Sequence, residues 1–238
     1  MNQVKSLIFD LYGTLINIRT DEGDPQVYTE LSKFLSYNQV NLSPEDLRGI
    51  YNEEIQRQLR KSREQYPEVD VWRVFSFILS RHSSGRFDLG LAVQAARLYR
   101  SLSRTYFEPF PGVYAMLVRL RDAYPLALLS DAQRCFSEPE ITMLRLNWLF
   151  DHIYFSSDYG FRKPDPRYFS LPLKALGVSP EEAVYIGDNP FRDLFGAKKA
   201  GMKMILVRSE EQEYEGFRPD IRINEITELE GIIKELAP

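Results

Sequence analysis

The stretch VKSLIFDLYGTLINI, residues 4–18, decides the class of fold. Residues 4–10 form a short apolar run that stops abruptly at the polar, glycine-bearing turn DLYGT, residues 10–14. A strand that is apolar on both faces is typical of a parallel sheet, because helices cover both of its faces. We therefore expect Asp10 to stand at the carboxyl end of a buried strand.

Later segments of the chain repeat this design. Four further apolar runs end in polar residues and are predicted strands: 126–130, 152–156, 183–188 and 204–208. Helix-length stretches lie between them: 113–123, 138–146, 167–175 and 194–200. Alternating strands and helices predict an α/β fold with a doubly wound parallel sheet.

The segment from about residue 26 to residue 106 breaks this rhythm. It is charged and amphipathic, its apolar residues recur at helical spacing, and it contains no convincing strand. Residues 83–86 predict a turn between two of its helices. We expect a helical domain at residues 17–107, inserted into a core of residues 1–16 and 108–238, with linkers near 17–24 and 104–111.

Composition narrows the functional classes. With 30 basic and 34 acidic residues the net charge is -4, which favours neither a nucleic-acid nor an anionic-membrane partner. The one cysteine, Cys135, cannot form an internal disulfide, which favours a reducing, cytoplasmic location. The longest apolar runs are strand-length, far below the ~20 residues that a membrane helix needs.

Polar side chains gather where the predicted strands end, and ligands bind at that edge of an open parallel sheet. These side chains are Asp10, Thr14, Ser130, Asp131, Lys163, Asp188 and Asp193. Neighbouring carboxylates in a partly dry site repel one another unless a cation compensates. Magnesium suits such oxygen ligands and commonly takes a substrate phosphate as well. The pattern therefore predicts a Mg²⁺ site at which hydroxyls and an ammonium hold a phosphate.

These residues resemble the haloacid dehalogenase superfamily of Rossmann-like hydrolases, most of whose members are phosphatases. Four motifs appear in the right order along nearly the whole chain: FDLYGTL (9–15), LSD (129–131), KP (163–164) and IGDN (186–189) followed by Asp193. The helical insertion resembles the cap of the subfamily whose α-helical cap follows the first motif. The resemblance thus implies hydrolysis of a small phosphorylated metabolite.

The resemblance also implies a role for each residue. Asp10 would be the nucleophile that forms an aspartyl-enzyme intermediate. Thr14, Ser130 and Lys163 would act in catalysis, and these three would bind substrate together with Asp131. The implied magnesium ligands are Asp10, the backbone carbonyl of Tyr12, Asp188 and Asp193.

Position 12 departs from the phosphatase pattern. Phosphatase members carry there an aspartate that serves as general acid and then as general base, whereas this chain has Tyr12. A tyrosine can donate a proton, but with a pKa near ~10 only about one in a thousand is ionised at pH 7 to act as base. We expect Tyr12 to be catalytic, with hydrolysis of the intermediate impaired most.

Tyr12 also resembles the dehalogenase branch, in which the aspartate displaces halide from a 2-haloacid without a metal. That branch has asparagine where this chain has Asp131, and serine and asparagine where it has Asp188 and Pro190. Without a cation, Asp188 would repel a carboxylate substrate. A magnesium-dependent phosphatase is therefore favoured, and the alternatives are a 2-haloacid dehalogenase and a weakly active or non-catalytic phosphate-binding protein.

Overall fold

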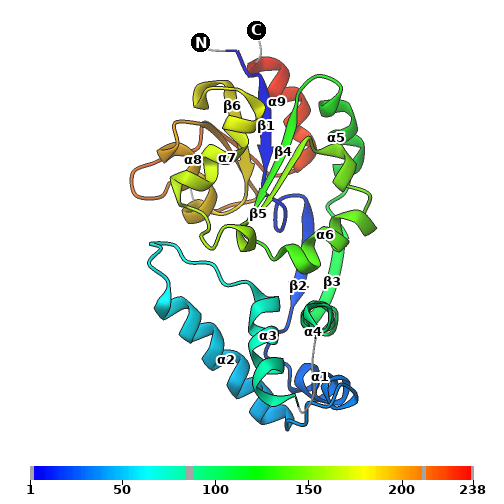
Figure 1. Cartoon of the computed structure of the whole chain (residues 1–238). Helices are drawn as coiled ribbons and strands as arrows, with labels where there is room; N and C mark the ends of the chain where they lie inside the picture. The colour runs from blue at the N-terminus through cyan, green and yellow to red at the C-terminus, as the bar shows by residue number, and fades with distance from the viewer. Residues whose placement is uncertain (1–2, 84–87, 211–212, 237–238) are drawn as a thin grey trace.

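The centre of the molecule is a six-stranded parallel sheet in the order β5-β4-β1-β6-β7-β8 (Figure 1). The computed structural model describes residues 3–83, 88–210 and 213–236. The strands of the sheet are β1 (Ser6–Phe9), β4 (Leu126–Ser130), β5 (His152–Phe155), β6 (Ala183–Gly187), β7 (Lys203–Val207) and β8 (Ile221–Ile223). The predicted doubly wound parallel sheet is confirmed. Among the six strands of this sheet, only β8 was not predicted, because a strand of three residues is too short to show a hydropathy pattern.

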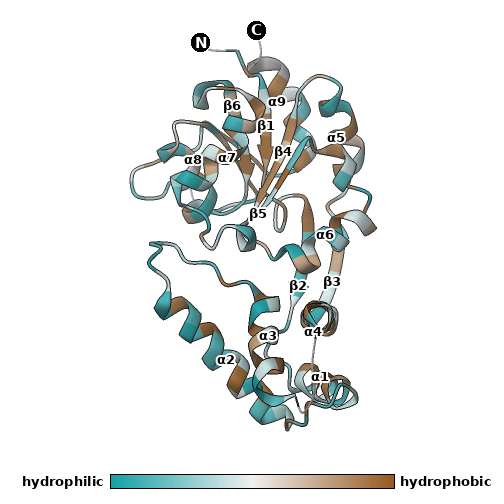
Figure 2. Cartoon of the chain, viewed as in Figure 1, coloured by the Kyte–Doolittle hydropathy of each residue, from teal (hydrophilic) through white to brown (hydrophobic). Residues whose placement is uncertain are grey.

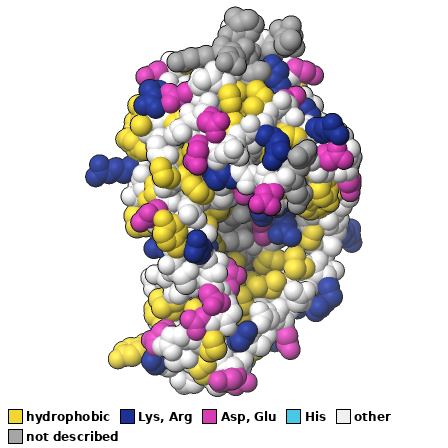
Figure 3. Space-filling model, turned by 180° about the vertical axis from the view of Figure 1, so that it is seen from behind, with side chains coloured by type: hydrophobic (Ala, Val, Ile, Leu, Met, Phe, Trp, Pro, Cys, Tyr) yellow, Lys and Arg dark blue, Asp and Glu magenta, His cyan; other side chains and the backbone are white. Residues whose placement is uncertain are grey.

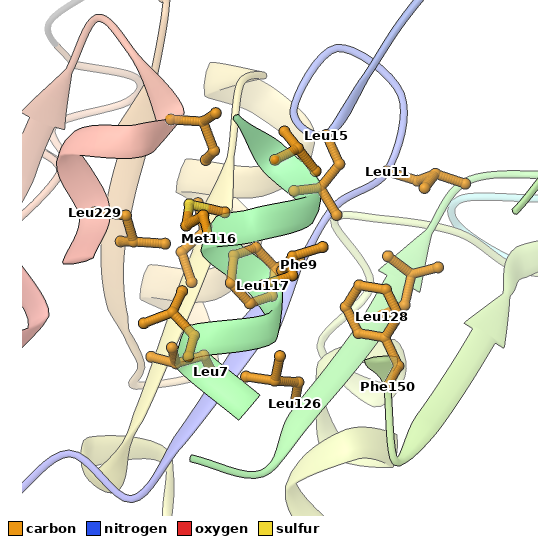
Figure 4. Close-up of a cluster of buried hydrophobic side chains, with 14 of the residues drawn as sticks. Leu7, Phe9, Leu11, Leu15, Met116, Leu117, Leu126, Leu128, Phe150 and Leu229 are labelled. Carbon is orange, nitrogen blue, oxygen red and sulfur yellow. The ribbon is translucent and has the colours of Figure 1, made fainter. Parts of the chain in front are cut away.

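Helices cover both faces of the sheet. Two helices, α5 (Val113–Arg121) and α9 (Leu229–Leu236), pack on the face to which Leu7 and Phe9 point (Figure 4). Two others, α7 (Pro166–Leu176) and α8 (Gly196–Lys199), cover the opposite face, where Ile8 is buried. Because side chains alternate along a strand, β1 contributes to both clusters, which is why its sequence is apolar throughout.

Two predicted helices begin earlier than expected. The segment expected at 138–146 is α6 (Arg134–Met143), which accommodates Pro139 in its interior. The segment expected at 194–200 is preceded by the π-helical turn η4 (Pro190–Phe195), which leads into α8. Pro139 lies in the interior of α6 and Pro190 is the first residue of η4, and a proline weakens the helical pattern of a sequence.

The predicted helical insertion consists of α1 (Pro25–Tyr37), α2 (Pro44–Lys61), α3 (Val71–His82) and α4 (Leu89–Ser103). These helices bury their own apolar cluster, which includes Leu31, Tyr51, Phe75 and Tyr99. The linkers differ from expectation, since β2 (Ile16–Thr20) and β3 (Arg104–Pro109) pair as an antiparallel ribbon between the sheet and these helices (Figure 1). The expectation of no strand between about residues 26 and 106 was therefore wrong where β3 begins at Arg104, and both strands occupy segments that were expected to be linkers. The predicted turn at 83–86 lies largely outside the described residues, and the domain boundaries stay a prediction.

The insertion also contacts the core at a second place. The docking loop, residues 62–70, joins α2 to α3 and reaches the segment that follows β5. The backbone amide of Glu68 donates to the carbonyl of Gly160, and that of Arg162 donates to the carbonyl of Tyr66, both at 3.0 Å. The helical insertion is thus held to the core by the ribbon and by the docking loop.

Hydropathy follows this architecture. The central strands are the most apolar part of the chain, whereas the helices of the insertion alternate apolar and polar residues (Figure 2). Acidic and basic side chains are interspersed on the face shown in Figure 3. Among the described helices, none is both long and apolar enough to cross a lipid bilayer.

Candidate active site

Three carboxylates meet at the carboxyl end of the sheet. Asp10 follows β1 and Asp188 follows β6, two strands that lie side by side, with Phe9 opposite Ile186. Asp193 comes from η4, which begins directly after the loop beyond β6. One carboxylate oxygen from each of the three lies within 4.8 Å of the others. The structure therefore brings together the three carboxylates that the sequence predicted to hold a metal.

Lys163 lies among these carboxylates and is 2% exposed. Its Nζ atom is 2.9 Å from Oδ1 of Asp10 and 2.6 Å from Oδ1 of Asp193. Burial alone would lower the pKa of this ammonium, but the adjacent Asp10 and Asp193 carboxylates raise it well above its usual range. Lys163 is therefore charged at neutral pH. Burial outweighs this ion pair at Asp10, so that the pKa of the Asp10 carboxyl is raised.

Asp188 is oriented by the loop that follows β1, residues 10–14. The hydroxyl of Thr14 donates to Oδ1 of Asp188 at 3.0 Å. Gly13 has a φ of +86°, and a Cβ atom at this position would lie only 2.4 Å from Oδ2 of Asp188. Burial, together with the nearby Asp10 and Asp193 charges, raises the pKa of Asp188 to about 7. The loop thus needs glycine both for its backbone conformation and for the close approach of this carboxylate.

Ser130 and Asp131 stand at the end of β4, next to β1 in the sheet. Ser130 is buried, and its backbone carbonyl accepts a hydrogen bond from the hydroxyl of Tyr168 at 2.8 Å. Oδ1 of Asp131 accepts the backbone amide of Lys163 at 2.9 Å, while its buried Oδ2 has no hydrogen-bond partner. Burial raises the pKa of Asp131 to about 7. Both residues therefore adjoin the site as predicted, and Asp131 also holds the loop that presents Lys163.

Tyr12 makes different contacts from those that its predicted role needs. Its hydroxyl donates to the buried carboxylate of Glu140 on α6 and lies 2.8 Å from Oγ of Ser137. Burial, followed by the Glu140 charge, raises the pKa of Tyr12 well above its usual range. These contacts do not favour an acid/base role. That role, and the metal contact of the Tyr12 carbonyl, stay predictions.

Sequence reasoning missed Tyr185, which is fully buried on β6. Its hydroxyl accepts from Nζ of Lys163 at 3.0 Å and lies 3.1 Å from both Oδ1 of Asp193 and the carbonyl of Leu129. One signal was available in the sequence. A tyrosine in an otherwise apolar, buried strand needs a hydrogen-bond partner for its hydroxyl.

Arg208 was missed as well. It follows β7, and its guanidinium donates to the backbone carbonyls of Gly13 and Thr14, each at 2.7 Å. Its charge also lies 3.6 Å from the ring centroid of Phe110. Arg208 thereby fixes the turn that follows Asp10. No pattern in the sequence predicts a contact between two segments so far apart in the chain.

This arrangement has a counterpart among known proteins. The family model described as haloacid dehalogenase-like hydrolase matches residues 7–207. The chain belongs to this family. The predicted resemblance is thus confirmed.

The proteins to which this chain is similar include phosphatases. A protein of Methanopyrus kandleri named glyceraldehyde 3-phosphate phosphatase is 29% identical over 196 residues, which cover 79% of this chain and 82% of the relative. A Pyrococcus furiosus protein of the same name is 35% identical over 108 residues, 45% of each chain, so the match spans about half of that relative.

The chain is also similar to dehalogenases. A Burkholderia cepacia protein named (S)-2-haloacid dehalogenase 4A is 26% identical over 242 residues, covering 96% of this chain and 94% of the relative. The solved structure of a 2-haloacid dehalogenase from Pseudomonas syringae superposes with a TM-score of 0.68 at 22% identity, over 98% of this chain and all of that one. A magnesium-bound HAD-hydrolase from Bacillus subtilis gives a TM-score of 0.59 at 21% identity, over 98% and 100%. At these identities the two structures establish the fold alone.

Proposed function

We propose that this chain is a magnesium-dependent phosphatase that hydrolyses a small phosphorylated metabolite through an aspartyl-phosphate on Asp10. The observation that carries the proposal is the group of three neighbouring carboxylates, Asp10, Asp188 and Asp193, of which Asp10 and Asp193 pair with a buried ammonium. A 2-haloacid carries its own carboxylate, which three such groups would repel. A divalent cation that binds together with the phosphate ester compensates the negative charge of both the ester and the carboxylates.

The donor set fits Mg²⁺. All three groups offer oxygen, and Mg²⁺ typically takes one or two carboxylates and keeps the rest of its shell for water and phosphate. Asp193 is already engaged, since its oxygens accept from Lys163 at 2.6 Å and from the backbone amide of Asn189 at 2.9 Å. We therefore assign Asp10 and Asp188 as the direct ligands and Asp193 as the partner of Lys163. When bound, the cation supplies positive charge that lets an anionic nucleophile approach an anionic phosphoryl group.

The steps of the proposed reaction can be assigned to residues of this chain. A carboxylate oxygen of Asp10 attacks phosphorus while the bond from phosphorus to the ester oxygen breaks, and the departing oxygen takes a proton from water to leave as an alcohol. Water then cleaves the acyl phosphate, which releases inorganic phosphate and restores the carboxylate. Lys163 holds Asp10 and a phosphate oxygen, Ser130 donates to another, and Thr14 keeps Asp188 in place.

The comparisons support this proposal. The Methanopyrus kandleri and Pyrococcus furiosus relatives carry the name of a sugar-phosphate phosphatase, and the Bacillus subtilis structure contains magnesium. We further propose that the helical insertion acts as a cap over the site and that the protein is cytoplasmic, the latter on the basis of its single buried cysteine, Cys135.

The test is hydrolysis of an aryl phosphate with and without Mg²⁺, run beside chloride release from a 2-haloacid. An aryl phosphate has a good leaving group and therefore hardly needs a general acid. We expect phosphate release that requires Mg²⁺ and is abolished by Asp10→Asn. Halide release without a metal would instead establish the dehalogenase, which Tyr12 and the Burkholderia cepacia relative favour. Inactivity in both assays would leave the non-catalytic phosphate-binding alternative.

A further inference from the structure

A buried carboxylate joins the helical insertion to residues 10–14, the loop that follows β1 and is called the nucleophile loop below. Glu140 lies on α6 of the core and is 4% exposed. From the core side, its Oε2 accepts the hydroxyl of Tyr12, two residues after the nucleophile. From the insertion, Nε and a terminal nitrogen of Arg100 on α4 donate to Oε1 at 2.8 Å and to Oε2 at 3.1 Å. Glu140 is therefore shared between the two parts of the molecule.

The surroundings of Glu140 strengthen this junction. Arg104, the first residue of β3 in the ribbon, lies 3.4 Å from Oε1 of Glu140. The guanidinium of Arg100 also lies 5.2 Å from the ring centroid of Tyr12, so these two side chains touch the carboxylate and each other. A carboxylate buried at this depth is stable only because charged and polar donors surround it.

Pro139 makes possible a second hydrogen bond between α4 and α6. A proline has no amide hydrogen, so inside α6 it leaves the carbonyl of Cys135, four residues earlier, without its helical partner. Nε of Arg97 on α4 donates to that carbonyl at 2.7 Å. Two arginines one turn apart on α4, Arg97 and Arg100, thus bind successive turns of α6.

The docking loop closes the insertion on the core at another place. There the contacts are backbone hydrogen bonds, from Glu68 to Gly160 and from Arg162 to Tyr66. The two amides are 3.0 Å from their acceptors, and each bond crosses between insertion and core. Their hydrogen exchange therefore reports how often the insertion separates from the core.

We propose that Glu140 is a positioning residue that holds the helical insertion closed on the core and, through the same carboxylate, fixes Tyr12 in the nucleophile loop. Tyr12 then links the nucleophile loop to the helical insertion, because its hydroxyl donates to Glu140 and its ring contacts Arg100. Closure and the arrangement of the nucleophile loop are coupled, because one carboxylate serves both. The consequence for turnover rests on the proposed phosphatase function, whereas the coupling itself does not.

The experiment is hydrogen exchange of the intact protein, comparing wild type with Glu140→Gln. This change keeps the shape of the side chain and removes the charge that Arg100 and Arg104 bind. We expect exchange at the amides of Glu68 and Arg162 to become about tenfold to hundredfold faster. The amide of Lys5, which donates to the carbonyl of Glu182 at 2.8 Å within the core and away from the nucleophile loop, keeps its wild-type rate.

Two further variants complete the test. Tyr12→Phe removes a single hydroxyl and leaves the arginine pairs intact, so it accelerates the same two amides by a smaller factor. Glu230→Gln removes a carboxylate that pairs with Arg119 within the core, and it leaves both amides unchanged. If Glu140→Gln does not fold, Tyr12→Phe and Arg104→Gln carry the test.

Unchanged exchange at Glu68 and Arg162 in all folded variants would overturn the proposal. Equal acceleration at those amides and at the amide of Lys5 would also overturn it, since Glu140 would then support only general stability. With aryl phosphate as substrate, Glu140→Gln raises KM more than it lowers kcat. A wild-type protein without phosphatase activity would refute the proposed function and leave the exchange result standing.

Discussion

The ammonium of Lys163 lies 2.9 Å from the carboxylate of Asp10, and both side chains are buried. The lysine follows β5 and the aspartate follows β1, so only the parallel sheet brings them to one edge. The same ammonium also contacts Asp193 and the Tyr185 hydroxyl. One cation therefore compensates several groups, which makes Lys163 the residue on which the charge balance of the site depends.

Lys163→Met tests this dependence. Removing one partner of a buried ion pair leaves uncompensated charge, which typically costs about 3–5 kcal/mol. We expect a loss of that order in the free energy of unfolding, measured by urea denaturation, and no detectable turnover. The matched control is Lys198→Met, whose partner Asp220 is on the surface at 2.9 Å and which changes stability by at most about 1 kcal/mol. Similar losses in the two variants would contradict the assignment.

Tyr185→Phe tests whether the hydroxyl on β6 positions Lys163. The variant removes the contacts to Lys163 and Asp193 without changing the volume of the core. We expect kcat to fall by about tenfold with little change in KM, and stability to fall by about 1 kcal/mol. The control is Tyr154→Phe, because the Tyr154 hydroxyl only reaches the carbonyl of Leu171, at 3.4 Å. An unchanged kcat in Tyr185→Phe would show that the hydroxyl has no part in the reaction.

Gly13→Ala separates backbone strain from crowding of Asp188. Gly177, which ends α7, also has a positive φ, +67° against +86° for Gly13, but a Cβ atom there meets nothing within 4 Å. Gly177→Ala should therefore cost only the strain of about 1 kcal/mol and keep full activity. Gly13→Ala should cost more and lower activity by about 100-fold, because its methyl group displaces the Asp188 carboxylate. Equal effects of the two changes on turnover would refute this explanation.

Much of the fold could be predicted because the strands are apolar throughout. Residues 126–130, for example, were predicted as a strand and form β4 with the same limits. The ribbon of β2 and β3 was missed, because most of its side chains are half-buried or exposed and show no buried pattern, as in Thr105 and Tyr106. Local periodicity reports burial, so it reveals central strands better than an exposed ribbon.

The site shows the same division. Asp10, Lys163, Asp188 and Asp193 were predictable because each follows a strand, and the sheet converts that order into proximity. The partner of Tyr12 was not predictable. Glu140 lies within an ordinary helical sequence, and its contact depends on how α6 meets α4, which is decided by tertiary packing rather than by spacing.

Asp70, at the end of the docking loop, should make stability depend on pH. Burial raises the pKa of its carboxyl to about 6, and its buried Oδ1 has no hydrogen-bond partner. The groups that face it are Arg73, with Nε at 3.6 Å, the Asp158 carboxylate and the Cys135 thiol. The folded state thus binds this proton more tightly than the unfolded state, so stability falls as pH rises from about 4 to about 6.

Asp70→Asn removes this titration. We expect the variant to match wild type near pH 4 and to be more stable by about 1 kcal/mol at pH 8, a value reduced for the partial exposure of the carboxylate. Urea denaturation at both pH values measures the difference. Asp24→Asn, the same change in an exposed residue that caps α1, serves as the control for the substitution itself. A gain of the same size at pH 4 and pH 8 would mean that the amide improves packing and that the buried charge is not responsible.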